Sequence, residues 1–291
     1  MKPVTTRLLV SMALAVQSGT LAAQQAPNTS QWQCGDCPYA KEQSGESAAS
    51  IVHVNSDSYA FGRHTGLKAG TYLGVDVSSG LADPNGDYYN LYATDVGLPY
   101  GSFEMESGVQ GKFKLKVRYA QLPYNASDSG RTIYGGIGTS SLTLPAGWVA
   151  GNTTANMPAL GASLYDVKIG STRKRADVGV SIIPARDWDV GMSYRQETRE
   201  GTRRMSGAFF FSSMQLVAPV NYVTEEVEAY ASYAARKWQV RLAYQGSTFT
   251  DGDSALRWQN AFAVPVAGAS VGQLALPPDN QAHQKSEAKR S

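Results

Sequence analysis

The amino-acid sequence predicts an all-β fold built from antiparallel strands. Glycine (29 residues) and tyrosine (16 residues) are abundant, and this composition suits turns and strands with aromatic edges better than long helices. The stretch from Gln110 to Pro123 alternates strictly, so an extended chain has one apolar face and one cationic face. The apolar positions are Phe113, Leu115, Val117 and Tyr119, and the cationic ones are Lys112, Lys114, Lys116 and Arg118. Further alternating runs follow between strong turn signals.

The overall composition excludes several classes of protein. A hydrophobic content of 42% with 17% charged residues is unlike a disordered chain. The formal net charge is only +2, so no global basic field favours nucleic-acid binding.

The N-terminus predicts export. Lys2 and Arg7 precede the apolar run from Leu8 to Val16, and the small residues at Ala22 and Ala23 suit signal-peptidase cleavage near Ala23. We therefore expect residues 1–23 to be a signal peptide. No later segment approaches the ~20 uninterrupted apolar residues of a membrane-spanning helix. A membrane role would thus require strands.

Residues 24–65 are expected to be a flexible periplasmic segment, because they are polar and rich in small residues. They contain Cys34 and Cys37, the chain's two cysteines. A pair with this spacing can form a structural disulfide, act as a redox-active thiol pair, or supply half of a zinc site. A second pair for a zinc ribbon is absent. Pro38 replaces the His that covalent haem attachment needs after the second Cys, so we expect no covalent haem on this chain.

The predicted strands follow in order, and they favour a membrane barrel. Several are about 8 to 10 residues long, near the ~9 to 11 residues that a tilted barrel strand needs. Short turns alternate with longer connections, as in bacterial outer-membrane barrels. Aromatic residues gather near strand ends, where a headgroup interface would lie. The predicted runs are Leu67–Val77, Asp87–Val96, Ser102–Gly108, Gly111–Leu122, Tyr165–Arg173, Ala176–Ile183, Trp188–Glu197, Arg203–Ser212, Glu225–Ala235 and Trp238–Thr248.

The segment from Asn125 to Gly161 has no clear period, and we expect a long connection at one rim. Its cluster Gly135-Gly136-Ile137-Gly138 suggests a phosphate-binding loop at first sight. However, the Lys-Ser/Thr pair that would close such a loop is missing, and no helix pattern follows. Tight turns explain the cluster better.

Several ordered motifs carry a family resemblance. They are Gly111-Lys112-Phe113-Lys114-Leu115, Leu142-Thr143-Leu144-Pro145-Ala146-Gly147-Trp148-Val149, Tyr222-Val223-Thr224, Tyr244-Gln245-Gly246-Ser247-Thr248-Phe249 and Pro278-Asp279-Asn280-Gln281-Ala282-His283-Gln284. Their succession resembles the MtrB/PioB family of decahaem-associated outer-membrane proteins, and Cys34 and Cys37 stand where that family has its N-terminal Cys-x-x-Cys pair. The resemblance implies a cell outer-membrane β-barrel that sheathes a periplasmic multihaem c-type cytochrome for extracellular electron transfer or metal oxidation or reduction.

The resemblance also sets the expected domain organisation. Residues 66–284 would form a partial antiparallel transmembrane β-barrel of roughly ten strands. Residues 285–291 form a charged tail that departs from the family, whose members are longer, so we expect an incomplete barrel. The haem would belong to a decahaem cytochrome inside the barrel, with an extracellular multihaem cytochrome and outer-membrane lipid as further partners.

The candidate site residues are the cations of the alternating stretch from Gln110 to Pro123. If the lumen holds a cytochrome, Lys112, Lys114, Lys116 and Arg118 would meet haem propionates or acidic protein surface. The alternative is that they merely line a wet lumen. The other charged groups predict no catalytic or metal site. Glu225, Glu226 and Glu228 are interpreted as lumen or turn charges, the Thr172–Arg175 run as a hydrated hairpin end, and His53, His64 and His283 as scattered residues without ligand spacing.

Three classes of function remain open. The first is the non-enzymatic barrel sheath of an electron conduit, in which the partner's haems carry the electrons. The second is a general diffusion porin. The third is a periplasmic thiol-disulfide protein built on Cys34 and Cys37, although no thioredoxin-like βαβ pattern surrounds them.

Overall fold

A computed structural model describes residues 42–209, 212–263, 271–277 and 280–286. All of these residues belong to the unit that runs from Tyr39 to Ser291. The predicted signal peptide, Cys34 and Cys37 lie outside the described residues, as do residues 287–291 of the charged tail.

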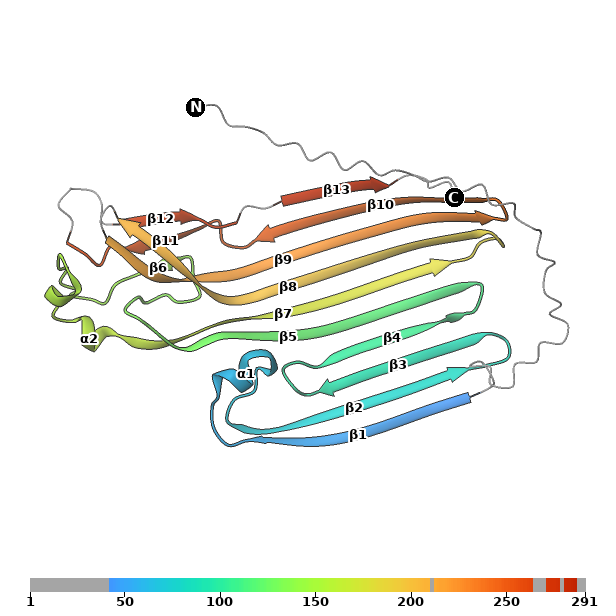
Figure 1. Cartoon of the computed structure of the whole chain (residues 1–291), viewed down its shortest axis with the longest axis horizontal. Coiled ribbons are helices and arrows are strands. Elements are labelled where there is room, and N and C mark those ends of the chain that lie inside the picture. The colour runs from blue at the N-terminus through green and yellow to red at the C-terminus, as the bar shows by residue number, and fades with distance from the viewer. Residues whose placement is uncertain (1–41, 210–211, 264–270, 278–279, 287–291) are drawn as a thin grey trace, which may run out of the picture. The chain divides into compact units, whose positions relative to one another are not determined.

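A ten-stranded antiparallel sheet dominates the described chain (Figure 1). Sequence neighbours are spatial neighbours throughout, apart from β6, β11 and β12. In sheet order the strands are β1 (Glu42–Val54), β2 (Gly70–Ala82), β3 (Asp87–Val96), β4 (Ser102–Val109), β5 (Phe113–Thr132), β7 (Tyr165–Ile182), β8 (Trp188–Phe209), β9 (Ser212–Ala235), β10 (Trp238–Asp251) and β13 (Asn280–Ser286). Within the described residues, β1 and β13 do not pair with each other, so the sheet is open.

The connections differ at the two ends of the sheet. Short turns join β2 to β3, β4 to β5, β7 to β8 and β9 to β10 at one end (Figure 1). The predicted Asp83–Gly86 turn is one of them: the Asn85 backbone N–H donates to Asp83 Oδ1 at 2.8 Å, and Gly86 adopts a φ of 88° that favours glycine. The opposite end carries the longest connections, which are the one from β5 to β7, the segment after β10 and the β1–β2 connection with the short helix α1 (Tyr59–Thr65). The shorter β3–β4 and β8–β9 connections also lie at this end.

The expected flexible segment 24–65 is ordered in its second half. β1 occupies Glu42–Val54 and pairs with β2 over its full length. Helix α1 follows, capped by Ser58 at its start and by Gly66 in a left-handed conformation at its end. It packs against β5, where Asn125 Nδ2 donates to the Gly62 carbonyl at 2.7 Å. The helix thereby covers β5 beyond the point where the shorter β4 stops pairing with it.

The long strands β5, β7, β8 and β9 correct several sequence-based boundaries. Two predicted strands, Tyr165–Arg173 and Ala176–Ile183, form the single strand β7, so the Thr172–Arg175 run lies inside a strand and not at a hairpin end. Trp188–Glu197 and Arg203–Ser212 likewise belong almost entirely to β8. The segment from Ser213 to Tyr222, which lies between two of the predicted strands, is part of β9. These strands continue through charged stretches, where the sequence alone predicts that a strand ends, because their backbones pair with those of the neighbouring strands.

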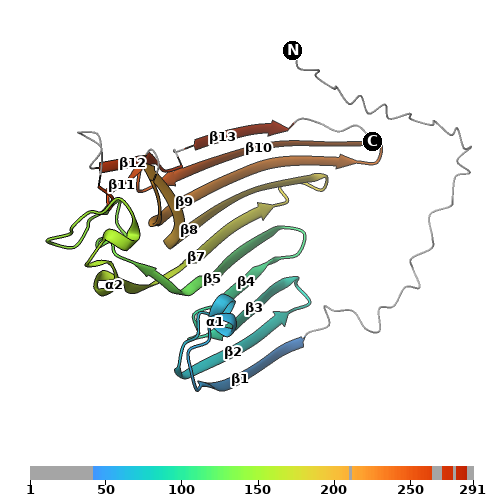
Figure 2. The same cartoon turned by 60° about the vertical axis from the view of Figure 1, so that its left-hand side comes forward.

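The described chain has a second, three-stranded sheet of β12 (Val271–Ala275), β11 (Ala255–Gln259) and β6 (Ser141–Leu142). This sheet packs against the last residues of β8 and the first part of β9. In Figure 2 this sheet lies beside the far ends of β8 and β9. The β5–β7 connection completes the assembly and contains the 3-10 helix η2 (Thr154–Asn156) and helix α2 (Leu160–Ser163). We call the described parts of residues 133–164, 205–220 and 254–277 the rim subdomain.

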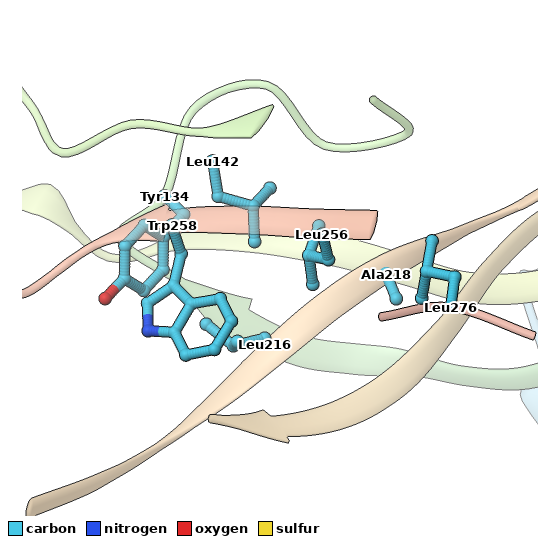
Figure 3. Packing of buried hydrophobic residues seen from close by; sticks show 7 residues of the cluster. All are labelled: Tyr134, Leu142, Leu216, Ala218, Leu256, Trp258 and Leu276. Carbon is cyan, nitrogen blue, oxygen red and sulfur yellow. The ribbon is translucent and has the colours of Figure 1, made fainter. Parts of the chain in front are cut away.

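The rim subdomain contains the main hydrophobic core of the described chain. Seven buried residues pack together there (Figure 3): Tyr134, Leu142, Leu216, Ala218, Leu256, Trp258 and Leu276. The Tyr134 hydroxyl donates to the Gln259 carbonyl at 2.9 Å, and burial raises the pKa of this hydroxyl. A smaller cluster of Val167, Ile169 and Val217 packs on the other side of β9. β9 is consequently buried on both faces from Leu216 to Val220.

Gly201 marks the place where β8 leaves its neighbour β7. The register between these strands ends at Gly170 and Thr202, and Gly201 has a φ of 146°. An added Cβ at this position would lie 2.2 Å from the Gly170 carbonyl oxygen.

We therefore expect Gly201→Ala to strain this corner by about 1–3 kcal/mol and to loosen the rim subdomain. Limited proteolysis should show faster cleavage within residues 133–164 in this variant. Gly161→Ala is the matched control, because its Cβ would meet nothing within 4 Å. Equal cleavage of the two variants would contradict the assignment of Gly201 as the corner.

Candidate functional site

One face of the sheet is apolar over a continuous area, which we call the apolar face. Cross-strand partners point to the same side, so the register fixes its members. Met192 is 54% exposed, Leu242 52% and Val180 45%. In a soluble protein, a continuous area of such apolar side chains would be buried against another layer. The central members of the apolar face are Phe113, Leu115, Val117, Tyr119, Val178, Val180, Ile182, Trp188, Val190, Met192, Tyr194, Trp238, Val240, Leu242 and Tyr244.

Aromatic residues bound the apolar face at both ends, as the sequence predicts. Phe113, Trp188 and Trp238 lie toward the short turns, and Tyr119, Tyr194 and Tyr244 toward the long connections. Six residue steps separate the two borders on each strand, which is about 20 Å of chain. Beyond the tyrosines the apolar side chains end on the same face, with the polar residues Gln121 and Gln196 and with Gly246, which has no side chain. The apolar band is therefore sharply delimited.

The opposite face is charged, and we call it the charged face. Its central feature is a row of alternating charges on five neighbouring strands, all in register: Glu104, Arg118, Asp177, Arg195 and Glu226. Arg195 Nε lies 2.7 Å from Asp177 Oδ1, and its Nη1 pairs with Glu226. Arg175 Nε contacts Asp177 Oδ2 at 2.8 Å. Asp177, Arg175, Arg195 and Glu226 therefore balance one another's charge, whereas Arg118 of the same row has no ion-pair partner within 4 Å among the described residues.

A hollow lies on the charged face beside this row. It has a volume of about 600 Å³ and is lined in part by Asp177, Arg195, Glu226, Glu228 and Gln245. Its side chains carry both signs of charge and several amide or hydroxyl groups. Such a lining suits water or a polar protein surface and does not single out one small ligand.

Three of the four predicted cations, Lys114, Lys116 and Arg118, lie on the charged face, and Lys112 lies in the turn before β5. The four cations are not equivalent. Lys116 Nζ lies 2.8 Å from Glu104 Oε1 and 3.6 Å from Glu106 Oε2, so its charge is already balanced. Lys112, Lys114 and Arg118 are exposed, and none has an ion-pair partner within 4 Å among the described residues. The structure thus leaves three of the four cations available.

The acidic residues divide between the two faces. Glu226 and Glu228 lie on the charged face, where Glu228 pairs with Arg241 at 3.2 Å. Glu225 lies on the other side, just beyond the apolar band, and accepts a hydrogen bond from the Tyr194 hydroxyl. The lumen or turn interpretation therefore fits Glu226 and Glu228, while Glu225 belongs to the border of the apolar face.

The remaining sequence motifs are the histidines and the glycine cluster. No group of three metal-ligating side chains gathers in the described parts of the chain. His53 contacts the Thr71 hydroxyl, and the His64 ring lies against Tyr124. Gly136 and Gly138 take left-handed conformations in a turn before β6. This turn is what the glycine cluster predicts.

No helix among the described residues is long and apolar enough to cross a bilayer. The exposed apolar band and its aromatic borders are instead the features of a sheet that faces lipid, with its charged side turned to a wet interior. Fold and surface together define an outer-membrane β-sheet protein of the porin type.

The chain belongs to the MtrB/PioB family of outer-membrane β-barrel porins, whose family model matches residues 53–287. A relative, outer membrane protein MtrB of Shewanella baltica (strain OS185), is 30% identical over 94% of this chain. The alignment spans 41% of the length of that relative. The protein is thus an outer-membrane protein of this family. The described sheet is open, and a closed barrel is a feature of the family.

Proposed function

We propose that this protein forms part of an outer-membrane barrel wall that encloses and positions a periplasmic multihaem c-type cytochrome, as a conduit for extracellular electron transfer or metal oxidation or reduction. The observation that carries the proposal is the pairing of a lipid-type apolar band with a charged inner face that keeps Lys112, Lys114 and Arg118 unpaired. Membership in the MtrB/PioB family supports it. The partner carries the haem, and this chain supplies insulation and position.

The two ends of the sheet give the wall its direction. Outer-membrane barrels have short periplasmic turns and longer external connections. The end with the short turns is therefore assigned to the periplasm, and the rim subdomain to the outside. Lys114 lies at the periplasmic end of β5, and Lys112 lies in the turn that precedes this strand. A periplasmic cytochrome would meet these cations as it enters the barrel.

The three free cations would pair with haem propionates or acidic side chains of the cytochrome. Each such pair would be partly exposed and worth about 0.5 kcal/mol, or about 1.5 kcal/mol for three. Replacing Lys112, Lys114 and Arg118 together by Gln should therefore weaken cytochrome retention about tenfold. Co-purified haem per barrel protein, measured at two salt concentrations, is the readout.

A matched control removes the same charge elsewhere. Lys68, Arg186 and Lys237 are exposed and lie in connections away from the turn and strand that carry Lys112, Lys114 and Arg118, so their replacement by Gln should leave retention unchanged. Undiminished retention in the first triple variant would remove the specific role of the cations. Rapid solute flux through vesicles that contain the barrel without cytochrome would favour the alternative, a general diffusion porin.

Cys34 and Cys37 stay a prediction, because they lie outside the described residues. A structural disulfide and a redox-active thiol pair are both open to test. If the chain were a thiol-disulfide protein, insulin reduction would depend on Cys34 and stop in Cys34→Ala. Insulin reduction that is absent or insensitive to this variant would leave the disulfide interpretation.

A further inference from the structure

The rim subdomain lies on the charged side of the sheet. The register between β8 and β9 runs without a bulge from Trp188 to Phe209, so side-chain alternation is continuous along both strands. Leu216 is ten residues from Glu226 on β9 and therefore shares its face. The core that β6, β11 and β12 build on Leu216 and Ala218 consequently stands on the interior side of the wall.

The second cluster shows that the β8–β9 hairpin is turned inward. Val217 alternates with Leu216 and belongs to the opposite, apolar side of β9. It packs against Val167 and Ile169 of β7, which share the charged face of β7 with Asp177. The end of the hairpin therefore lies over the interior side of β7. The Gly201 corner supplies the bend.

The rim subdomain is almost free of charge. Residues 133–164, 205–220 and 254–277 contain a single charged side chain, Arg257, in a chain whose charged content is 17%. Hydrated external loops have no physical need for such depletion. Loss of charged residues at the centre of a patch is instead the compositional mark of a protein–protein interface.

Alternation in β11 and β12 identifies the surface that would be used. Leu256 and Trp258 point into the core against β9, so Arg257 points away from the wall. Val271 and Gln273 share this orientation, and Val271 is 56% exposed. We call these side chains and their neighbours Ala255, Gln259 and Ala275 the inner surface of the rim subdomain.

We propose that the inner surface of the rim subdomain is a docking surface for the protein that the barrel encloses, and that it holds this protein at the outer mouth. The proposal rests on the proposed function, under which the enclosed protein is a multihaem cytochrome. Continuity with the charged wall argues for this occupant, because both surfaces border the same interior. The charged face would hold the cytochrome through several charged groups, and the rim subdomain would hold it through contacts that are uncharged apart from Arg257.

Site-specific photo-crosslinking tests the proposal in cells that make the barrel protein with its cytochrome. A benzophenone amino acid placed at Val271 or Gln273 should give, on irradiation, an adduct that contains both chains and stains for haem. Ile51 and Leu73 are the matched controls: they are exposed hydrophobic residues at 77% and 58% and lie on the apolar face, where lipid is the expected neighbour.

The outcomes separate the two proposals. Adducts at Val271 and Gln273, with none at Ile51 and Leu73, support the docking surface. Cytochrome that co-purifies with the barrel but forms no adduct at either rim position overturns the docking surface and leaves the proposed function intact. Absence of co-purifying cytochrome from the unmodified protein overturns the proposed function, and the docking surface with it.

Discussion

Met192→Arg is expected to lower the free energy of unfolding in lipid by about 2–4 kcal/mol, the range for a cation placed near the middle of the lipid face of a barrel. Met192 lies between Trp188 and Tyr194, inside the band that both aromatic borders delimit, and 54% of its surface is exposed. The guanidinium of an arginine at this position would lie in hydrocarbon unless the side chain extended beyond Trp188 or Tyr194 to the membrane surface. Either arrangement costs free energy.

The neighbouring residue supplies the control. Ser193 points to the charged face beside Asp177 and Arg195, so Ser193→Arg keeps its charge in water and should change stability by about 0.5 kcal/mol or less. Guanidinium titrations of the barrel protein in lipid vesicles, followed by tryptophan fluorescence, measure both. Equal destabilisation by the two variants would contradict the assignment of the faces.

Sequence alone predicts the membrane part of this wall well, because a single physical constraint acts on each residue there. Lipid on one side and water on the other impose a period of two, and the Trp188–Tyr194 and Phe113–Tyr119 runs show it directly. The turn at Asp83–Gly86 is equally legible, since its side-chain hydrogen bond and glycine are local features.

Outside the membrane band this constraint no longer acts, and the sequence alone does not predict the extent of the strands there. β7 continues through Thr172–Arg175, where every residue is polar, because backbone pairing with β5 and β8 stabilises the strand. Leu216–Val220 is buried on both faces, so its sequence shows no alternation and resembles a loop. The pairing of β1 with β2 depends on a distant partner and is invisible in the polar sequence of residues 42–54.

The candidate site was only partly predictable for a related reason. The side of the strand on which Lys112, Lys114, Lys116 and Arg118 lie follows from alternation. Their availability depends on the neighbouring strand, where Glu104 and Glu106 neutralise Lys116. The sequence does hold a signal for this pairing, since Phe103, Met105 and the two glutamates alternate as apolar and acidic positions.

Trp258→Ala is expected to cost the rim subdomain about 3–5 kcal/mol, the range for truncating a large buried aromatic side chain. Trp258 is 4% exposed, and its indole ring fills the space above Gly207 and Gly272, where an added Cβ would approach it to 2.5 Å. Its ring also meets Phe209 edge-on, with centroids 5.8 Å apart. No other side chain can refill this space, because both glycines lack one.

The loss of stability in Trp258→Ala should be confined to the rim subdomain. The membrane band shares no core residue with the rim subdomain, so assembly in the outer membrane should continue while hydrogen exchange accelerates in β6, β11 and β12. Val271→Ala, at an exposed position of the same sheet, should leave exchange unchanged. If Trp258→Ala abolished membrane assembly, the rim subdomain would have to be an obligatory part of the barrel's folding core rather than a subdomain built upon it.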